Sequence, residues 1–573
     1  MSEPTTETEG QSTATGVTED PTPFGWLNTA DHKRVGRLFI VTSLLMLALA
    51  LVLDALVRLD LTDDADHVVL DGDTFAQMFA LSRESLVLLF LIPAFLGVAM
   101  YIVPLQVGAA NLAFPRAATA AYWSWVVSAG VLIGAYLGNG GPYGGWSDGV
   151  DLHMLALGGL VLSLLMGAIN VATTVLTHRS TGMFLDRSSP FAWSMLVTAS
   201  MLIVSLPVLF GQLAILYVDH RYGTVFLGGN QGIWGRIDWI HEAPQLFIYT
   251  VPVLGIVAEI ILGSVRRRVF EPLAMYFMIG LVGLFGFGAW ANFSITNEGT
   301  DLADGFEGIV LVGMYGGATV GILGLLGLLG FAAFQARKDK PKLTTPLLAA
   351  FGAGTMMLLA ALYGLVGAGA DWLEIAGRGN DGNPYLRDTT WITGQQSVLI
   401  YGAGFLGLLA ALHWWAPKIW GRSLNNLMGM LSLLLVAAGA ALATAGPAIA
   451  GAFAETPDFV YGDPNATSLY ADWVDASSGP GMAWLSLAGV LIAGGGMIVL
   501  KLNLLVSVLL KKGDEAEADP WSATAPEWML DSPPAMGPMS DLPNIDSGTP
   551  LLDASEAEAA EVAKAEVAKE VSV

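Results

Sequence analysis

The chain has 573 residues, of which 54% are hydrophobic and only 13% are charged. Soluble domains carry about 25% charged residues, so this composition excludes an ordinary soluble protein and indicates an integral membrane protein. The net charge of −24 argues against a nucleic-acid partner, and the absence of cysteine excludes disulfides and thiolate metal sites.

Residues 1–25 are rich in Ser, Thr, Glu and Pro and are predicted to form a disordered acidic tail. Residues 26–512 are predicted to form an all-α transmembrane bundle, because runs of about 20 apolar residues cross a bilayer and helices satisfy their own backbone there. Twelve such spans are predicted, near residues 36–57, 76–104, 119–139, 153–176, 190–218, 244–265, 271–293, 307–335, 344–367, 396–416, 424–446 and 482–510.

Residues 513–573 are predicted to form a Pro-rich and acidic tail that is irregular up to residue 553. The Ala/Glu/Lys-rich end beyond it forms either a solvated helix or a floppy tail, and we favour the floppy tail because isolated helices this short are marginal. Lys and Arg gather in one set of loops, whereas the loops on the other side are acidic, as in "LTDDADHVVLDGD". Basic loops face the cytoplasm in most membrane proteins, so both termini are predicted to be cytoplasmic. We expect a multi-pass protein of a prokaryotic plasma membrane, with membrane lipid as one partner.

Three charged residues lie inside the predicted spans. The stretch "LSRES" places Arg83 and Glu84 in the second span, and Glu259 lies in the sixth. Charges in a span are costly and by default suggest a function or a buried partner. Three readings of Arg83 and Glu84 stay open: snorkelling to the outer surface, pairing with other helices inside the bundle, or a role in transport. Glu84 projects about 100° away from Arg83, so it is a poor partner for it.

Several stretches carry a resemblance to a known family. They are "MYIVPLQVGAANLAFPR" at 100–116, "GAINVATTVLTHRSTGMFLDRSSPFAWS" at 167–194, "WWAPKIWGR" at 414–422 and "DPWSATAPEWMLDSPP" at 519–534. In this order they resemble subunit I of the haem–copper terminal oxidases. The resemblance implies the twelve-helix fold of that subunit and a place in a membrane respiratory complex. It also implies haem and copper held by six histidines in four helices.

None of these six positions holds a histidine in this chain. The resemblance assigns them, here called the six ligand positions, to Ser82, Ala243, Asn292, Phe293, Gln395 and Ser397. The proton-passing Glu of some members falls on Gln245, and the His–Asp pair of the outer Mg²⁺ site falls on Arg387 and Asp388. An Arg beside an Asp suggests a contact between the two side chains in place of the ion.

The chain has seven histidines, all of which we expect in loops or at helix ends. His241 lies two residues before the copper position Ala243, and we interpret it as an interfacial, hydrogen-bonded histidine rather than a copper ligand.

These positions predict a cofactor-free relative of the oxidase subunit, with no catalytic residue and no metal. Such a chain would act as a structural or regulatory component beside other membrane subunits of a respiratory assembly. One alternative is a functional cytochrome c or quinol oxidase subunit with haem and copper, which reduces O₂ to water and pumps protons. Another is an ion or small-solute channel through the space of the missing cofactors.

Overall fold

The computed structural model describes residue 25 and residues 28–62, 72–227, 233–287, 301–338, 342–373, 386, 389–453, 480–537, 547 and 549–571. The regular secondary structure of these residues is helical, and their only β-type pairing is an isolated bridge between Arg422 and Glu515. The all-α fold expected from the sequence is therefore confirmed for the part of the chain that is described.

Eleven helices in the described ranges are long and apolar enough to cross a membrane. The predicted span 271–293 corresponds to the shorter apolar helix α10 (Pro272–Phe285), and residues 288–293 lie outside the described ranges, so the number twelve is not confirmed. The single-helix spans are α2 (His32–Asp60), α5 (Pro115–Leu137), α6 (Ser147–Thr177), α7 (Pro190–Tyr222), α9 (Leu246–Val265), α12 (Asp301–Gln335), α13 (Thr345–Trp372) and α16 (Asn426–Ala452).

Three further spans contain a π-helical segment. They are α3 (Gly72–Glu84) with η1 (Ser85–Leu91) and α4 (Ile92–Val107); α14 (Trp391–Ser397) with η7 (Val398–Gly404) and α15 (Phe405–Trp420); and α18 (Pro480–Leu504) with η8 (Leu505–Leu509). π-helical turns inside α-helices are rare and are frequent at functional sites.

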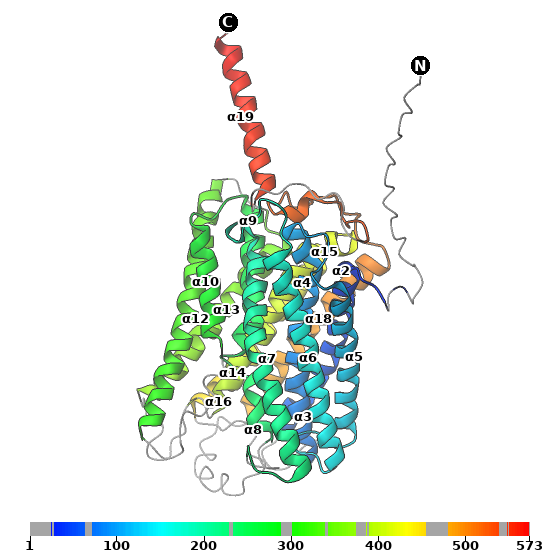
Figure 1. The fold of residues 1–573 in the computed structure, drawn as a ribbon. Coiled ribbons are helices and arrows are strands. Elements are labelled where there is room, and N and C mark those ends of the chain that lie inside the picture. The colour runs from blue at the N-terminus through cyan, green and yellow to red at the C-terminus, as the bar shows by residue number, and fades with distance from the viewer. Residues whose placement is uncertain are drawn as a thin grey trace, which may run out of the picture.

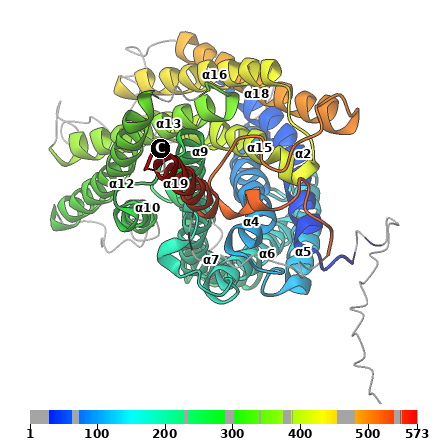
Figure 2. The ribbon, with the colours of Figure 1, turned by 90° about the horizontal axis from the view of Figure 1, so that it is seen from above.

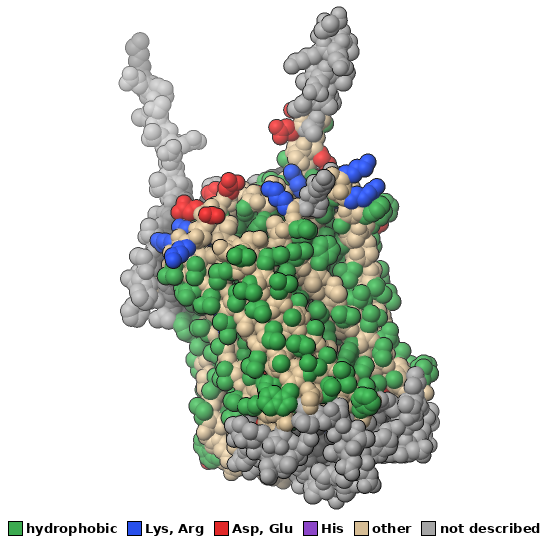
Figure 3. All heavy atoms as spheres, turned by 180° about the vertical axis from the view of Figure 1, so that it is seen from behind, with side chains coloured by type: hydrophobic (Ala, Val, Ile, Leu, Met, Phe, Trp, Pro, Cys, Tyr) green, Lys and Arg blue, Asp and Glu red, His purple; other side chains and the backbone are tan. Residues whose placement is uncertain are grey.

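The spans form an upright bundle, with α4, α9 and α15 inside and the other helices around them (Figures 1 and 2). The most apolar stretches of the three inner spans are 100% buried, whereas those of the outer α5 and α7 are only 39% and 33% buried. Figure 3 shows the outer face covered with hydrophobic side chains, as expected for a surface in contact with lipid.

The C-terminal segment 513–537 packs against one end of the bundle, where α2 also begins. The Gly537 amide donates to Asp31 just before α2 (3.0 Å), and Trp528 in the short helix η9 (Pro526–Met529) is 2% exposed. We call this end the basic end, because Lys and Arg side chains gather there in Figure 3. Apart from η9, residues 513–537 consist of turns and irregular backbone, yet they pack on the bundle and bury an aromatic and a charged side chain in it.

Of the two readings of the last residues, the helix is found and the floppy tail is not: Pro550–Val571 form the helix α19, which projects from the basic end (Figure 1). Ala, Glu and Lys are good helix formers, and the start of α19 is also tied to the bundle by ion pairs of Arg268 with Asp553 and Glu556.

The expectation that every histidine lies in a loop or at a helix end is wrong. α6 begins at Ser147, so His153 lies almost two turns inside it and is 0% exposed. α15 continues to Trp420 and carries His413, which is 4% exposed. The predicted spans 153–176 and 396–416 are too short at these ends, because polar residues near a helix end can be buried by neighbouring helices.

Candidate functional site

Two of the six ligand positions, Ser82 on α3 and Ser397 on α14, lie on either side of a buried ion pair from α2. The Arg58 Nε donates to Asp54 Oδ2 at 2.7 Å. The Ser82 hydroxyl donates to Asp54 Oδ1 (3.4 Å), and Arg58 Nη2 donates to the Ser397 hydroxyl (3.3 Å). The Tyr401 hydroxyl completes the group by donating to Asp54 Oδ2 at 2.6 Å. We call these five residues the Asp54–Arg58 network.

The local structure explains why this network forms. Asp54 and Arg58 are four residues apart on α2, so both side chains lie on the same face of that helix. That face contacts α3 with η1, and it is buried, since Asp54 is 3% and Arg58 5% exposed. A π-helical segment follows each serine, with η1 beginning at Ser85 and η7 at Val398. Tyr401 lies within η7 and reaches the carboxylate from there.

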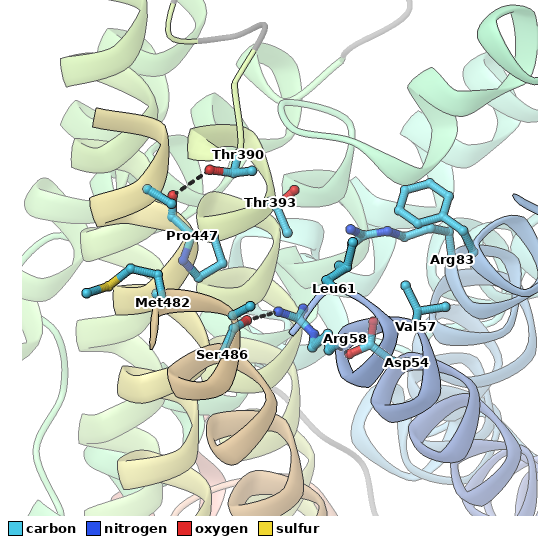
Figure 4. A pocket seen from close by; sticks show the side chains of 14 residues that line it. Asp54, Val57, Arg58, Leu61, Arg83, Thr390, Thr393, Pro447, Met482 and Ser486 are labelled. Atoms are coloured by element: carbon cyan, nitrogen blue, oxygen red, sulfur yellow. Dashed lines mark hydrogen bonds and ion pairs between the residues drawn. The ribbon is translucent and has the colours of Figure 1, made fainter. Parts of the chain in front are cut away.

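A cavity of about 50 Å³ adjoins the network at the end of the bundle away from the basic end (Figure 4). Arg58 and Arg83 both point toward it in Figure 4. Its lining residues come from five spans: Asp54, Val57, Arg58, Leu61, Phe79, Arg83, Thr390, Thr393, Gly446, Pro447, Ala450, Met482, Ala483 and Ser486. The volume has room for a few water-sized groups and is far too small for a porphyrin.

Arg83 neither snorkels nor forms an ion pair with a residue that the structure describes. Its side chain is buried, at 8% exposure, and its guanidinium lies 5.0 Å from the centre of the Phe79 ring. Snorkelling, one of the three readings of Arg83, is thus contradicted by its burial. Pairing of Arg83 itself is likewise not found among the described residues.

Glu84 has the buried partner that the sequence could not name. Its Oε1 lies 2.8 Å from His153 Nε2, and its Oε2 accepts from the Tyr136 hydroxyl at 3.1 Å. The side chains of Glu84 and His153 are both fully buried. The pair joins α3 to α6, so the second charged residue of "LSRES" has a structural partner on another helix.

The ligand position Gln395 also holds helices together. It accepts from the Tyr315 hydroxyl of α12 (3.3 Å) and donates to the Ala360 carbonyl of α13 (3.2 Å). Gln245, at the proton-passing position, is 0% exposed and donates to the Tyr249 hydroxyl at 3.1 Å. Gln395 therefore cross-links its own helix to α12 and α13, whereas the Gln245–Tyr249 hydrogen bond joins the start of α9 to the same helix.

The copper position Ala243 offers no ligand atom, and its neighbour His241 is not the interfacial histidine we expected. His241 is 1% exposed, and its ring stacks on Trp234 with 5.5 Å between centres. Neither of its ring nitrogens has a hydrogen-bond partner among the described residues. The expectations for Asn292, Phe293, Arg387 and Asp388 concern positions outside the described residues.

Glu259 on α9 faces a second buried carboxyl group, Glu527 of η9, at the basic end. Glu527 accepts from Gln106 Nε2 and Trp415 Nε1, both at 3.0 Å. Burial raises the pKa of Glu527, against the opposing effect of these two hydrogen bonds. Nearby, the Lys418 ammonium donates to the carbonyls of Ala518 (2.9 Å), Leu530 and Asp531 (3.3 Å) in the C-terminal segment.

Comparison with known proteins identifies the scaffold. Residues 34–492 match the family described as Cytochrome C and Quinol oxidase polypeptide I. The chain belongs to this family, that of haem–copper oxidase subunit I. It is 27% identical to a heme-copper oxidase subunit I+III of Aeropyrum pernix over 93% of this chain and 63% of the relative, so it spans less than two thirds of that protein.

Other relatives cover more of their own length. The chain is 25% identical to a cytochrome c oxidase subunit 1 of Bacillus subtilis, over 92% of this chain and 82% of the relative. Among solved structures, a heme-copper terminal oxidase dimer matches with a TM-score of 0.65 and 12% identity, over 92% of this chain and 89% of that chain. This likeness supports the fold alone.

Family members bind haem and copper, but the residues at the described ligand positions do not fit these groups. Haem iron takes His, Cys, Met or Tyr as axial ligand, and the serine hydroxyls at 82 and 397 are none of these. Tyr401 is of a suitable type, yet its hydroxyl donates to Asp54. The ion pair also lies in the place between the two serines, where a low-spin haem of the family would be held.

The residues at the copper positions do not fit a copper ion either. A three-histidine copper site needs imidazoles from two helices, whereas the assigned positions carry Ala243, Asn292 and Phe293. His241 could supply one imidazole, but among the described residues no three His, Asp or Glu side chains are grouped so that they could hold a metal ion.

The sequence interpretation missed Asp54, Arg58, Tyr401, Glu527 and Lys418. The signal for the first two was present, since an Asp and an Arg four residues apart at the end of an apolar run form a helical ion pair. Tyr401 and Glu527 had no comparable signal, because their partners lie on other helices.

Proposed function

We propose that the chain is a cofactor-free member of its family and acts as a structural or regulatory component of a membrane respiratory assembly. The observation that carries this proposal is the Asp54–Arg58 ion pair between Ser82 and Ser397. An ion pair held on both sides by hydroxyl groups takes the place of two imidazoles and the iron between them. Separating the two members of a buried ion pair costs free energy, so binding a haem between Ser82 and Ser397 would carry the cost of separating Asp54 from Arg58.

Gln395 supports the same proposal from another position. Its amide forms hydrogen bonds with two different helices, so it stabilises the bundle rather than presenting a free ligand atom. The scaffold thus keeps the family's spans while its polar interior serves helix packing. We further propose that the basic end faces the cytoplasm of a prokaryotic cell, because the Lys and Arg side chains gather there.

The rival functions lack such support. An active oxidase requires iron and copper ligands that the described positions do not offer. A channel requires a continuous polar path, whereas the cavity beside Arg58 lies at one end of a bundle whose inner spans are fully buried in their apolar stretches.

The test measures haem and copper in the purified protein. Membranes and detergent-purified protein are assayed by the pyridine haemochrome spectrum and by elemental analysis, with the Bacillus subtilis cytochrome c oxidase prepared in parallel. We expect well under one haem and one copper per chain both in the membranes and in the purified protein, whereas the Bacillus subtilis oxidase should contain both. A strong Soret band with about one haem or more per chain would overturn the proposal and favour the oxidase.

A further inference from the structure

We propose that the cavity beside the Asp54–Arg58 network binds a small monovalent anion such as chloride, held by Arg83, Arg58 and the Thr393 hydroxyl. This site goes beyond the proposed function. The observations that carry it are the charges, the hydrogen-bond donors and the size of the cavity.

The charges that line the cavity do not balance. Two guanidinium groups, Arg58 and Arg83, line it together with one carboxylate, Asp54. Asp54 is already engaged by Arg58, by Tyr401 at 2.6 Å and by Ser82 at 3.4 Å. Arg83 has a face-on contact with Phe79 but no ion pair or hydrogen bond among the described residues. An unpaired charge inside a membrane protein is costly, and a bound anion removes that cost.

Apart from the Asp54 carboxylate, the polar side chains that line the cavity carry hydrogen-bond donors. The Thr393 side chain lines the cavity, and its hydroxyl has no hydrogen-bond partner among the described residues. The Ser486 hydroxyl accepts from Arg58, so its own hydrogen remains available to donate. The Thr390 hydroxyl, by contrast, already donates to the Pro447 carbonyl at 3.0 Å. Figure 4 shows the guanidinium groups of Arg58 and Arg83 pointing toward the space between these side chains.

Size and charge select the class of anion. A volume of about 50 Å³ accommodates an ion of the size of chloride or nitrate with one or two waters, and no larger carboxylic acid. The excess of one positive charge among the lining residues matches a single negative charge. Cations are repelled by the same excess, and the remaining lining residues are mostly apolar.

The experiment measures the thermal unfolding midpoint of the purified full-length protein in detergent. Sodium chloride is titrated against sodium gluconate at constant ionic strength, because gluconate is too large for the cavity and screens charges equally. Wild type is compared with Arg83→Gln and with Arg116→Gln, a control at an exposed arginine of the basic end. We expect chloride at about tenfold over its dissociation constant to raise the wild-type midpoint by about 2 °C.

Arg83→Gln should weaken this chloride response roughly tenfold or more, since hydrogen bonds to charged groups contribute about 1.5–3 kcal/mol, whereas Arg116→Gln should leave it unchanged. Thr393→Val, which keeps the charges and the shape, should weaken it several-fold and serves if Arg83→Gln does not fold. Equal responses to chloride and gluconate in wild type, or an unaltered chloride response in both cavity variants, would overturn the site. Haem measured on the same sample separates this outcome from failure of the proposed function.

Discussion

Buried charges occur at both ends of this molecule, but they do different things. Away from the basic end, the Asp54–Arg58 pair and the Glu84–His153 pair connect transmembrane helices to one another. At the basic end, Glu527 and Lys418 connect the C-terminal segment to the bundle through an amide, an indole and backbone carbonyls. The first region includes Ser82 and Ser397, which the sequence resemblance assigns to haem-ligand positions, whereas the second includes the stretch 519–534, which resembles the family's C-terminal segment.

This difference suggests that the residues around Ser82 and Ser397 can be replaced without changing how the C-terminal segment packs on the bundle. A cofactor ligand can be replaced when another group satisfies the polar interior, and here α2 supplies that group. The C-terminal segment has no such substitute, because one lysine satisfies three carbonyls at once. Four substitutions test this comparison.

Asp54→Leu is expected to have the largest effect. It leaves Arg58, at 5% exposure, without its carboxylate, and breaking a buried pair in this way costs about 3–5 kcal/mol. The measurement is thermal or denaturant unfolding in detergent. Asp148→Leu is the matched control, because Asp148 is 71% exposed in its pair with Arg221 and should cost at most about 1 kcal/mol. The double variant Asp54→Leu/Arg58→Met should recover most of the loss. If Asp54→Leu were as mild as Asp148→Leu, the Asp54–Arg58 network would not hold the helices together.

Lys418→Met is expected to cost somewhat less, about 2–3 kcal/mol, because three buried carbonyls lose a charged donor while the side-chain volume is kept. Limited proteolysis should then cut within residues 513–537, a segment packed on the bundle in the wild type. The exposed Lys512→Met is the control and should change neither property. Wild-type resistance of Lys418→Met to protease would contradict the role assigned to this lysine.

Glu527→Gln is expected to change the pH dependence of stability, with a smaller effect on stability itself than the two preceding variants. Burial raises the folded-state pKa of Glu527 above its ordinary value. The stabilising contribution of the protonated form is therefore complete below the ordinary carboxyl pKa and is lost as the pH rises through the folded-state pKa. The wild type should therefore lose stability as the pH rises above the ordinary carboxyl pKa, and Glu527→Gln should show a flatter profile. Glu515→Gln, at an 85% exposed carboxylate, is the control. Parallel profiles for wild type and Glu527→Gln would rule out this assignment.

The sequence predicted the membrane spans well, because a long apolar run and a family-like stretch can each be recognised from residues that are close together in the chain. It failed where contacts join distant residues. Asp54 and Tyr401 are 347 positions apart, and nothing in either span indicates the other. Glu84 was recognised as unusual in a span, but its partner His153 was placed at a helix end, since the start of α6 is polar. The absence of histidine at the ligand positions could be read directly, whereas the ion pair between two of them could not.

Arg83→Leu is expected to have the smallest effect on stability in the absence of chloride. A paired Arg83 would make this change as costly as Asp54→Leu, but Arg83 forms no ion pair with a described residue. The substitution loses a contact with Phe79 that is worth about 0.5–2 kcal/mol. Because leucine has no guanidinium, the cost of burying one is removed rather than added, and this gain opposes the lost contact with Phe79. The unfolding midpoint in gluconate should therefore be nearly unchanged or slightly higher than that of wild type. Measured beside Asp54→Leu under the same conditions, a loss of similar size in both variants would show that Arg83 belongs to the Asp54–Arg58 network after all. The unequal charges of the cavity predict a different result. Arg83→Leu should cost little in gluconate, and it should fall below wild type when chloride is added, because only the wild type keeps Arg83 to bind the ion.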